Sequence, residues 1–201
     1  MDYLILVSFL SLAFWVFLTF FHGRTDFLKN FHFWSNKIVF ENFLAYSIKK
    51  KLNKKICVII PARNEEKTIL RTIKSIEDQK INNLEIIVVD DNSTDKTSEI
   101  VNKFKRKFKK ISLLSGKKLP NGWVGKTWAL KQAVDFANRK KYDYYVFIDS
   151  DIIIERNLLM NVSKFIDNND LEMVSLMAKL KCKTVWEKIL IPPFIFFFQK
   201  I

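Results

Sequence analysis

Tyr144-Tyr145-Val146-Phe147-Ile148-Asp149-Ser150-Asp151 is an apolar run that ends in two aspartates. The apolar part has the length of a buried strand. Because successive side chains of an extended segment alternate between its two faces, the carboxylates of Asp149 and Asp151 are expected to point the same way. A hard divalent cation such as Mg²⁺ binds one or two carboxylates and takes its other ligands from water and substrate phosphates. The stretch predicts a strand followed by a metal site, and a turn with two solvated acids is the alternative.

Similar strand patterns alternate with helical patterns along much of the chain. Short apolar runs predict strands at 56–60, 84–89, 111–114 and 144–148, and a fifth at 173–178. Amphipathic periodicity predicts helices at 65–79, 94–109, 126–138 and 155–167. This alternation is typical of an α/β fold with a mostly parallel sheet and flanking helices.

Three polar turns follow predicted strands, at 61–64, at Asp90-Asp91 and at 149–151. Ligands of such sheets bind outside the carboxyl ends of the strands. We therefore expect the three turns to meet along one rim of the sheet, although they are far apart in the sequence.

The amino-terminal end of the chain is apolar. No charged residue occurs from Tyr3 to Phe21, about 19 positions, which is enough to cross the hydrocarbon layer of a bilayer. Basic residues follow it, whereas a signal peptide would begin with a basic region and end in small residues. The pattern predicts a single-pass helix in the cytoplasmic membrane, with the domain that follows it in the cytoplasm.

Charge and cysteine content limit the partners. The chain has 201 residues and a formal net charge of +13, with lysine clusters at 49–55, 103–110 and 139–141. Beside a membrane helix, such clusters favour contact with anionic lipid head groups, and a solvated lysine-rich surface is the alternative. Nucleic acid is not predicted, because no zinc-ligand spacing or RNA-binding signature accompanies the charge. Cys57 lies in an apolar run and is expected in the core.

These features predict four regions. A transmembrane anchor is expected at 1–24, an amphipathic connector next to the membrane at 25–53, and the α/β domain at 54–184. The apolar stretch at 185–201 is too short to span a bilayer and is expected to lie at its interface as a truncated segment.

Three sequence motifs resemble those of family 2 glycosyltransferases, which have the nucleotide-diphospho-sugar-binding GT-A fold. They are Val58-Ile59-Ile60-Pro61-Ala62-Arg63-Asn64-Glu65-Glu66, Val88-Val89-Asp90-Asp91-Asn92-Ser93-Thr94-Asp95 and Asp149-Ser150-Asp151. The stretches 119–130 and 186–200 resemble the narrower group of hopene-associated glycosyltransferases. The likeness covers the front half of such an enzyme.

The resemblance implies roles for particular residues. Asp91 matches the acid that holds the base or ribose of the donor, and a carboxylate accepts hydrogen bonds from both. Asp149 and Asp151 match the metal motif, with Mg²⁺ or Mn²⁺ as the ion. Lys126 matches a lysine that neutralises a phosphate. The expected nucleotide-binding set is Pro61, Ala62, Arg63, Asn64, Glu65, Asp90, Asp91 and Lys126.

The implied reaction transfers a sugar from a nucleotide donor, with a UDP-sugar favoured, to a lipid acceptor such as a hopanoid or a polyprenyl lipid. Relatives invert the anomeric centre and use a carboxylate base well beyond the Asp149-Ser150-Asp151 motif, so no catalytic base is expected within this chain. The alternatives are a membrane-tethered remnant that binds nucleotide-sugar without catalysis and a fragment of a processive polysaccharide synthase.

Overall fold

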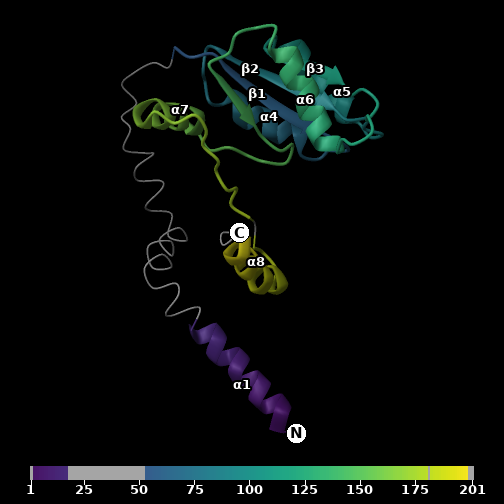
Figure 1. The fold of residues 1–201 in the computed structure, drawn as a ribbon. Helices are drawn as coiled ribbons and strands as arrows, with labels where there is room; N and C mark the ends of the chain where they lie inside the picture. The colour runs from purple at the N-terminus through teal and green to yellow at the C-terminus, as the bar shows by residue number, and fades with distance from the viewer. Residues whose placement is uncertain (1, 18–52, 181, 199–201) are drawn as a thin grey trace. The chain divides into compact units, whose positions relative to one another are not determined.

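The structure, a computed structural model, describes residues 2–17, 53–180 and 182–198 (Figure 1). The chain forms two units. One comprises Met1–Leu52 and Asn157–Asn169, and its described helices are α1 (Asp2–Phe17) and α7 (Leu158–Asn169). The other comprises Asn53–Arg156 and Asp170–Ile201 and holds the sheet.

The prediction of a transmembrane helix at the amino-terminal end is wrong. Helix α1 has 16 residues, and at 1.5 Å per residue it measures about 24 Å, less than the hydrocarbon thickness of a bilayer. Among the residues that the structure describes, no helix combines the length and the apolar character that a membrane crossing requires. Apart from Asn53, the expected connector at 25–53 lies outside the described residues.

A four-stranded parallel sheet forms the centre of the second unit, which confirms the predicted α/β architecture. Its strands lie in the order β3-β2-β1-β4. Their bounds are β1 (Ile56–Ala62), β2 (Leu84–Asp90), β3 (Ile111–Ser115) and β4 (Tyr144–Phe147). Ile59 in the central strand β1 pairs with Ile87 of β2 and Phe147 of β4, so strand ends gather at two opposite rims.

The predicted strand at 173–178 is wrong, because the described residues 171–180 contain no strand. Met173 is 83% exposed, so this apolar run has no neighbouring strand that buries it. The predicted turn at 61–64 begins later than expected. Pro61 and Ala62 belong to β1 and pair with Val89 and Asp90.

Helices cover both faces of the sheet (Figure 1). Helix α6 (Gly125–Ala137) presents a row of alanines that lets it approach closely, and it packs against Cys57, Ile59, Ile87 and Val89. The opposite face carries Val58, Ile60 and Val88, which α4 (Ile69–Glu77) and α5 (Thr97–Lys107) cover. The side chains that these two helices bury include Ile69, Ile73, Ile76, Val101 and Phe104. Each such burial contributes about 1.5–3 kcal/mol.

Cys57 is fully buried, which confirms its expected place in the core. Burial, with a smaller effect of the nearby Glu85 carboxylate, raises the pKa of Cys57 to about 12. The side chain therefore stays a thiol at neutral pH and acts as a small apolar group.

Helix α8 (Val185–Phe198) occupies the apolar stretch near the carboxyl end. Its exposed large side chains include Val185, Trp186 and Leu190. Apart from Glu187 and Lys188 the sequence of this helix is apolar, which is typical of a segment that contacts a further apolar surface.

Candidate functional site

The carboxyl ends of the four strands form one rim of the sheet, which we call the carboxyl rim. Hydrogen bonds join the turns after β1 and β2 at this rim. The Asn64 backbone N–H donates to Ser93 Oγ at 3.0 Å, and the Thr94 N–H donates to Asn64 Oδ1 at 2.8 Å. The Glu65 N–H donates to Thr97 Oγ1 at 2.8 Å. Because these bonds link residues about 30 positions apart, the two turns form one rigid polar edge.

Two asparagines allow the backbone to bend at this edge. Asn64 has a φ of 56° and Asn92 a φ of 57°, both in the left-handed region. Asparagine tolerates this region better than most residues with a side chain. Asn64 therefore has a structural role in addition to its predicted place in the donor site.

Asp95 strengthens the same edge. Its carboxylate accepts hydrogen bonds from the Glu66 N–H at 3.0 Å and from Thr97 Oγ1 at 2.5 Å. Desolvation alone would raise the pKa of Asp95, but the hydrogen bonds from Thr97 and Glu66 together lower it. The charged carboxylate is thus the form that holds the two turns together.

The adjacent acids Asp90 and Asp91 have different surroundings. The Asp90 carboxylate accepts hydrogen bonds from the Ser93 N–H at 3.0 Å and from the Ser98 hydroxyl group. One carboxylate oxygen therefore binds the turn after β2, and the other binds the first turn of α5. This geometry gives Asp90 a structural part in the turn, while its predicted contact with a nucleotide stays a prediction.

Asp91 lies in a narrow recess between two glycines. A Cβ atom added to Gly125 would stand 3.1 Å from Asp91 Oδ2, and one added to Gly116 would stand 3.2 Å from Asp91 Cα. The Asp91 N–H donates to the Ala62 carbonyl at 2.8 Å, which fixes its backbone. Arg63 Nη1 lies 3.8 Å from Asp91 Oδ2. The recess thus holds a carboxylate whose side chain is 16% exposed, next to the first residue of α6.

Lys126 connects this recess to the turn after β4. Its Nζ lies 2.7 Å from Asp149 Oδ1, and both side chains are more than half exposed. Lys126 is the second residue of α6, directly after Gly125. The carboxyl ends of β1, β2 and β4 and the start of α6 are therefore linked by a continuous set of contacts.

Asp149, Ser150 and Asp151 form a turn beyond β4. The Ile152 N–H donates to the Asp149 carbonyl at 3.2 Å, and Ser150 is buried while Asp149 and Asp151 are exposed. The Ser150 carbonyl accepts a hydrogen bond from Thr72 Oγ1 at 2.8 Å. These residues form a turn and not the extended segment from which the sequence prediction argued, and Thr72 on α4 fixes the centre of the turn.

Thr72→Val is expected to destabilise the fold and weaken metal binding. Valine keeps the volume of the fully buried Thr72 but leaves the Ser150 carbonyl without its donor, which costs about 1–3 kcal/mol. Chemical denaturation measures this loss, and Mn²⁺ titration followed by electron paramagnetic resonance measures the affinity. Thr68→Val, at the N-cap of the same helix, is the control because the Thr68 hydroxyl bonds Glu65 and not Ser150. Equal metal affinities in both variants and the wild type would contradict the positioning role of Thr72.

The pair of carboxylates fits a hard divalent ion that is bound mainly through its substrate. The Asp149 carboxylate pairs with the Lys126 ammonium group at 2.7 Å. The described residues include no group of three or more His, Cys, Asp or Glu side chains that would enclose a metal. Mg²⁺ and similar ions keep water and phosphate ligands and need only one or two carboxylates.

The sequence interpretation missed several residues that shape this rim. Gly116 and Gly125 admit the Asp91 carboxylate, and Thr72, Thr97 and Ser98 fix the turns. A glycine at a strand end and another at a helix start, in a chain with four glycines, were the available signals. Ala62 is buried, and its carbonyl bonds Asp91, so it supports the site through its backbone.

A parallel sheet with polar turns and two exposed acids at its carboxyl rim is typical of α/β proteins that bind a ligand at the carboxyl ends of the strands. The sequence model of the family described as glycosyl transferase family 2 matches residues 57–200. The chain belongs to this family.

Two curated relatives illustrate the range of the similarity. A 4,4'-diaponeurosporenoate glycosyltransferase of Staphylococcus haemolyticus is 35% identical over 97 residues, 48% of this chain and 24% of the relative. The poly(ribitol-phosphate) beta-N-acetylglucosaminyltransferase TarS of Staphylococcus aureus is 35% identical over 132 residues, 63% of this chain and 21% of the relative. The chain matches about a quarter or less of the length of either relative.

Among solved structures, S. aureus TarS 1-349 in complex with UDP-GlcNAc is similar, with 28% identity and a TM-score of 0.47. The match covers 64% of this chain and 37% of that one. Glucosyl-3-phosphoglycerate synthase from Mycobacterium tuberculosis, in a complex containing Mn²⁺ and UDP, has 30% identity and a TM-score of 0.42, and the match covers 61% of this chain and 41% of that one.

Proposed function

We propose that the carboxyl rim binds a nucleoside diphosphate sugar, with a UDP-sugar favoured, and that the chain takes part in transferring the sugar to an acceptor hydroxyl group. The proposal rests on a continuous series of contacts that runs from Arg63 through Asp91 and α6 to Asp149. It brings a hydrogen-bond acceptor for a nucleoside, a cation for phosphate and two exposed carboxylates to one edge. Membership of glycosyltransferase family 2 supports the same reaction class.

Each part of the rim suits one part of such a donor. The Asp91 carboxylate accepts a hydrogen bond from a uracil imide or a ribose hydroxyl group. Lys126 and the first backbone N–H groups of α6 attract the diphosphate. Asp149 and Asp151 would hold Mg²⁺ or Mn²⁺, which supplies positive charge for the leaving nucleoside diphosphate. Arg63, which is 66% exposed, is placed to contact either the base or Asp91.

Calorimetry with UDP tests donor binding directly. The proposal predicts that the wild-type chain binds UDP in the presence of Mn²⁺ and binds it much more weakly after chelation. A chain that shows no UDP binding with or without Mn²⁺ would overturn the proposal. Because this experiment measures affinity alone, its result does not depend on which group acts as the catalytic base.

Lys126→Ala is expected to weaken UDP binding by about five-fold, because an exposed charge contributes about 1 kcal/mol or less. The same variant removes the partner of Asp149 at 2.7 Å. Lys131→Ala is a matched control, since Lys131 lies on the same helix and pairs with Asp135 at 2.5 Å. Calorimetry that finds equal affinities for the two variants would contradict a phosphate contact by Lys126.

For the acceptor we propose a lipid, and for the location the cytoplasmic face of a membrane, with the chain bound at its surface. The exposed apolar side chains of α8, Trp186 at 73% and Leu190 at 63%, support an apolar partner. One relative is named for 4,4'-diaponeurosporenoate and another for poly(ribitol-phosphate), so the family accommodates different acceptors. A hopanoid acceptor remains a prediction that rests on the likeness of 119–130 and 186–200 to hopene-associated enzymes.

A radiolabelled UDP-sugar tests the acceptor class. Membranes and the purified chain are incubated together, and the label is followed into solvent-extractable lipid and into water-soluble polymer. Label in the lipid fraction supports a lipid acceptor, and label confined to polymer contradicts it. Donor binding without any transfer would support the alternative of a nucleotide-sugar-binding protein without catalysis.

A further inference from the structure

The turns at the amino-terminal ends of the four strands carry most of the basic clusters of the sheet unit. These clusters are residues 54–55 before β1, Lys80 before β2, residues 107–110 before β3 and residues 139–141 before β4. Each lysine and arginine in them is exposed, except Lys54, which is half-buried. We call these four clusters the basic rim.

Hydrogen bonds between the turns show that the basic rim is one continuous surface. The Lys55 N–H donates to Asp143 Oδ2 at 2.7 Å, which joins the turns before β1 and β4. The Ile56 N–H donates to the Asn83 carbonyl at 2.9 Å, which joins the turns before β1 and β2. Lys110 Nζ donates to the Asn82 carbonyl, which adds the turn before β3.

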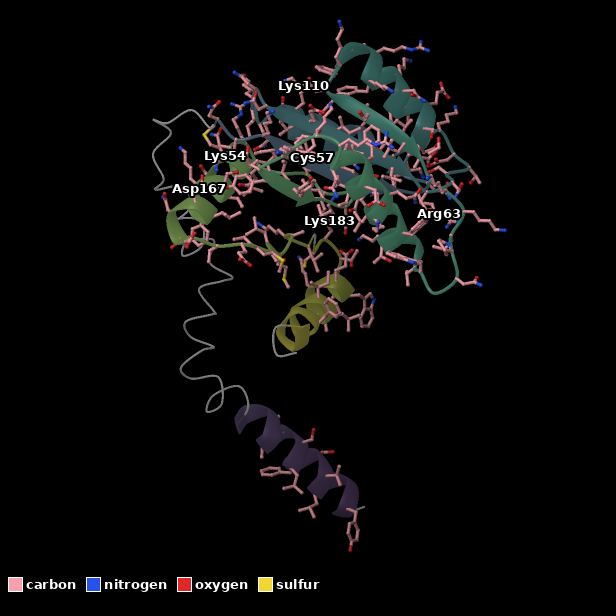
Figure 2. All side chains as sticks on the ribbon, turned by 45° about the horizontal axis from the view of Figure 1, so that its top comes forward. Lys54, Cys57, Arg63, Lys110, Asp167 and Lys183 are labelled. Carbon is pink, nitrogen blue, oxygen red and sulfur yellow. The ribbon has the colours of Figure 1, made fainter. Side chains whose placement is uncertain are left out.

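The opposite rim is mixed in charge. The carboxyl rim carries the acids Glu65, Glu66, Asp90, Asp91, Asp95, Asp149 and Asp151 together with the basic residues Arg63, Lys67, Lys96, Lys117, Lys118 and Lys126. Figure 2 shows Lys54 and Lys110 at the end of the sheet that lies away from Arg63. Strand β1 has seven residues, so about 23 Å separates the two rims. The basic clusters are therefore not at the proposed donor site.

We propose that the basic rim is a docking surface for an anionic lipid bilayer, which leaves the carboxyl rim facing away from the lipid. A flat row of exposed lysines attracts the negative potential of acidic lipids, and each basic residue near the surface contributes to binding. All four strands start at this rim, and in the sequence the first of them, β1, follows the apolar helix α1, whose exposed side chains include Leu6, Phe9 and Leu10.

The side chains of the rim favour lipid phosphates over nucleic acid. Lysines predominate, and lysine acts as a point charge, whereas the planar fork of arginine is the side chain preferred for nucleic-acid recognition. The aromatic rings nearby are already engaged. Tyr142 donates its hydroxyl to Glu85 at 2.9 Å, Tyr145 donates to Asn138 at 2.9 Å, and Phe108 stacks on Phe104. They are not open platforms for base stacking.

This inference does not require the proposed sugar transfer, but it constrains the acceptor. A hydroxyl group that reacts at the carboxyl rim must stand about 23 Å from the lipid phosphates. A lipid whose hydroxyl is carried on an extended head group meets this condition.

Two triple variants with the same change in charge test the docking surface. The rim variant carries Lys107→Gln, Lys109→Gln and Lys141→Gln, and the control carries Lys96→Gln, Lys117→Gln and Lys118→Gln. All six lysines are exposed, so both variants are expected to keep the wild-type melting temperature. Cosedimentation compares vesicles of phosphatidylcholine with vesicles of an equimolar mixture of phosphatidylcholine and phosphatidylserine.

The difference in partitioning between the two vesicle types isolates the effect of charge. The quantity compared is the ratio of the partition coefficients for anionic and neutral vesicles. At low salt this ratio is expected to fall about 100-fold in the rim variant, while the control keeps most of it. Equal losses in both variants, or no preference of the wild type for anionic vesicles, would overturn the proposal. Random duplex DNA that outcompetes anionic vesicles for the wild type would overturn the choice of a lipid surface.

Discussion

Asp91→Ala is expected to weaken binding of UDP by about 10- to 100-fold. A hydrogen bond to a charged group contributes about 1.5–3 kcal/mol when it is shielded from water, and the recess between Gly116 and Gly125 shields this carboxylate. Among the described residues, Asp91 has the only side-chain carboxylate that lies next to both glycines. Isothermal titration calorimetry with UDP and Mn²⁺ measures the change.

Two further variants separate this effect from a general loss of structure. Asp91→Asn keeps the shape and one acceptor oxygen and is expected to lose less affinity than the alanine variant. Asp90→Asn disturbs the bonds to Ser93 and Ser98 and is expected to lower the melting temperature more than the UDP affinity. Wild-type affinity in a folded Asp91→Ala variant would refute the assigned role of Asp91.

The second large effect is expected from Asp149→Ala combined with Asp151→Ala. The double variant removes both ligands assigned to Mn²⁺, so the addition of Mn²⁺ should no longer improve UDP binding. Asp151→Ala alone is expected to abolish the improvement, because Asp149 also pairs with Lys126. The ratio of UDP affinities with and without Mn²⁺ measures the effect.

Asp135→Ala is the matched control, since it removes one exposed acid of α6 that pairs with a lysine, as Asp149 does. It should keep the Mn²⁺ dependence of the wild type. If the double variant keeps that dependence as well, the metal assignment of Asp149 and Asp151 is wrong.

The sheet could be predicted from the sequence because its signals are local. Apolar runs such as 56–60 and 84–89 have the length and residue types of buried strands, and the helices between them have a clear apolar side. The parallel order then follows from the alternation of strands and helices. Met173–Ala178 has the same composition, but composition does not reveal whether a neighbouring strand is available to pair with it.

The membrane helix was wrong because hydropathy alone does not give the length of a helix. Tyr3 to Phe21 contains enough apolar residues, but none of the helices in the described residues has the length and apolar character of a membrane span. The sequence also did not reveal where the basic clusters lie in the fold. The basic clusters are spread along the chain, and only the topology places residues 54–55, 107–110 and 139–141 on the rim opposite Asp91.

At the carboxyl rim, the sequence indicated the turns but not the contacts that shape them. It pointed to Asn64, Asp91 and Asp149, which the structure joins through neighbouring turns. Two contacts depend on tertiary packing, so local sequence patterns do not predict them. They are the close approach of Gly125 to Asp91 and the hydrogen bond from Thr72 to Ser150.

Paramagnetic broadening by Mn²⁺ in the presence of UDP tests the central claim, that one rim binds the donor. Amide signals of residues 63–65, 91–92, 125–126 and 149–151 should broaden strongly together, while those of 54–55, 80, 109–110 and 139–141, about 23 Å away, should broaden far less because the effect falls steeply with distance. Broadening confined to the second set, or spread evenly over both, would contradict a donor site built by Asp91, Lys126 and Asp149.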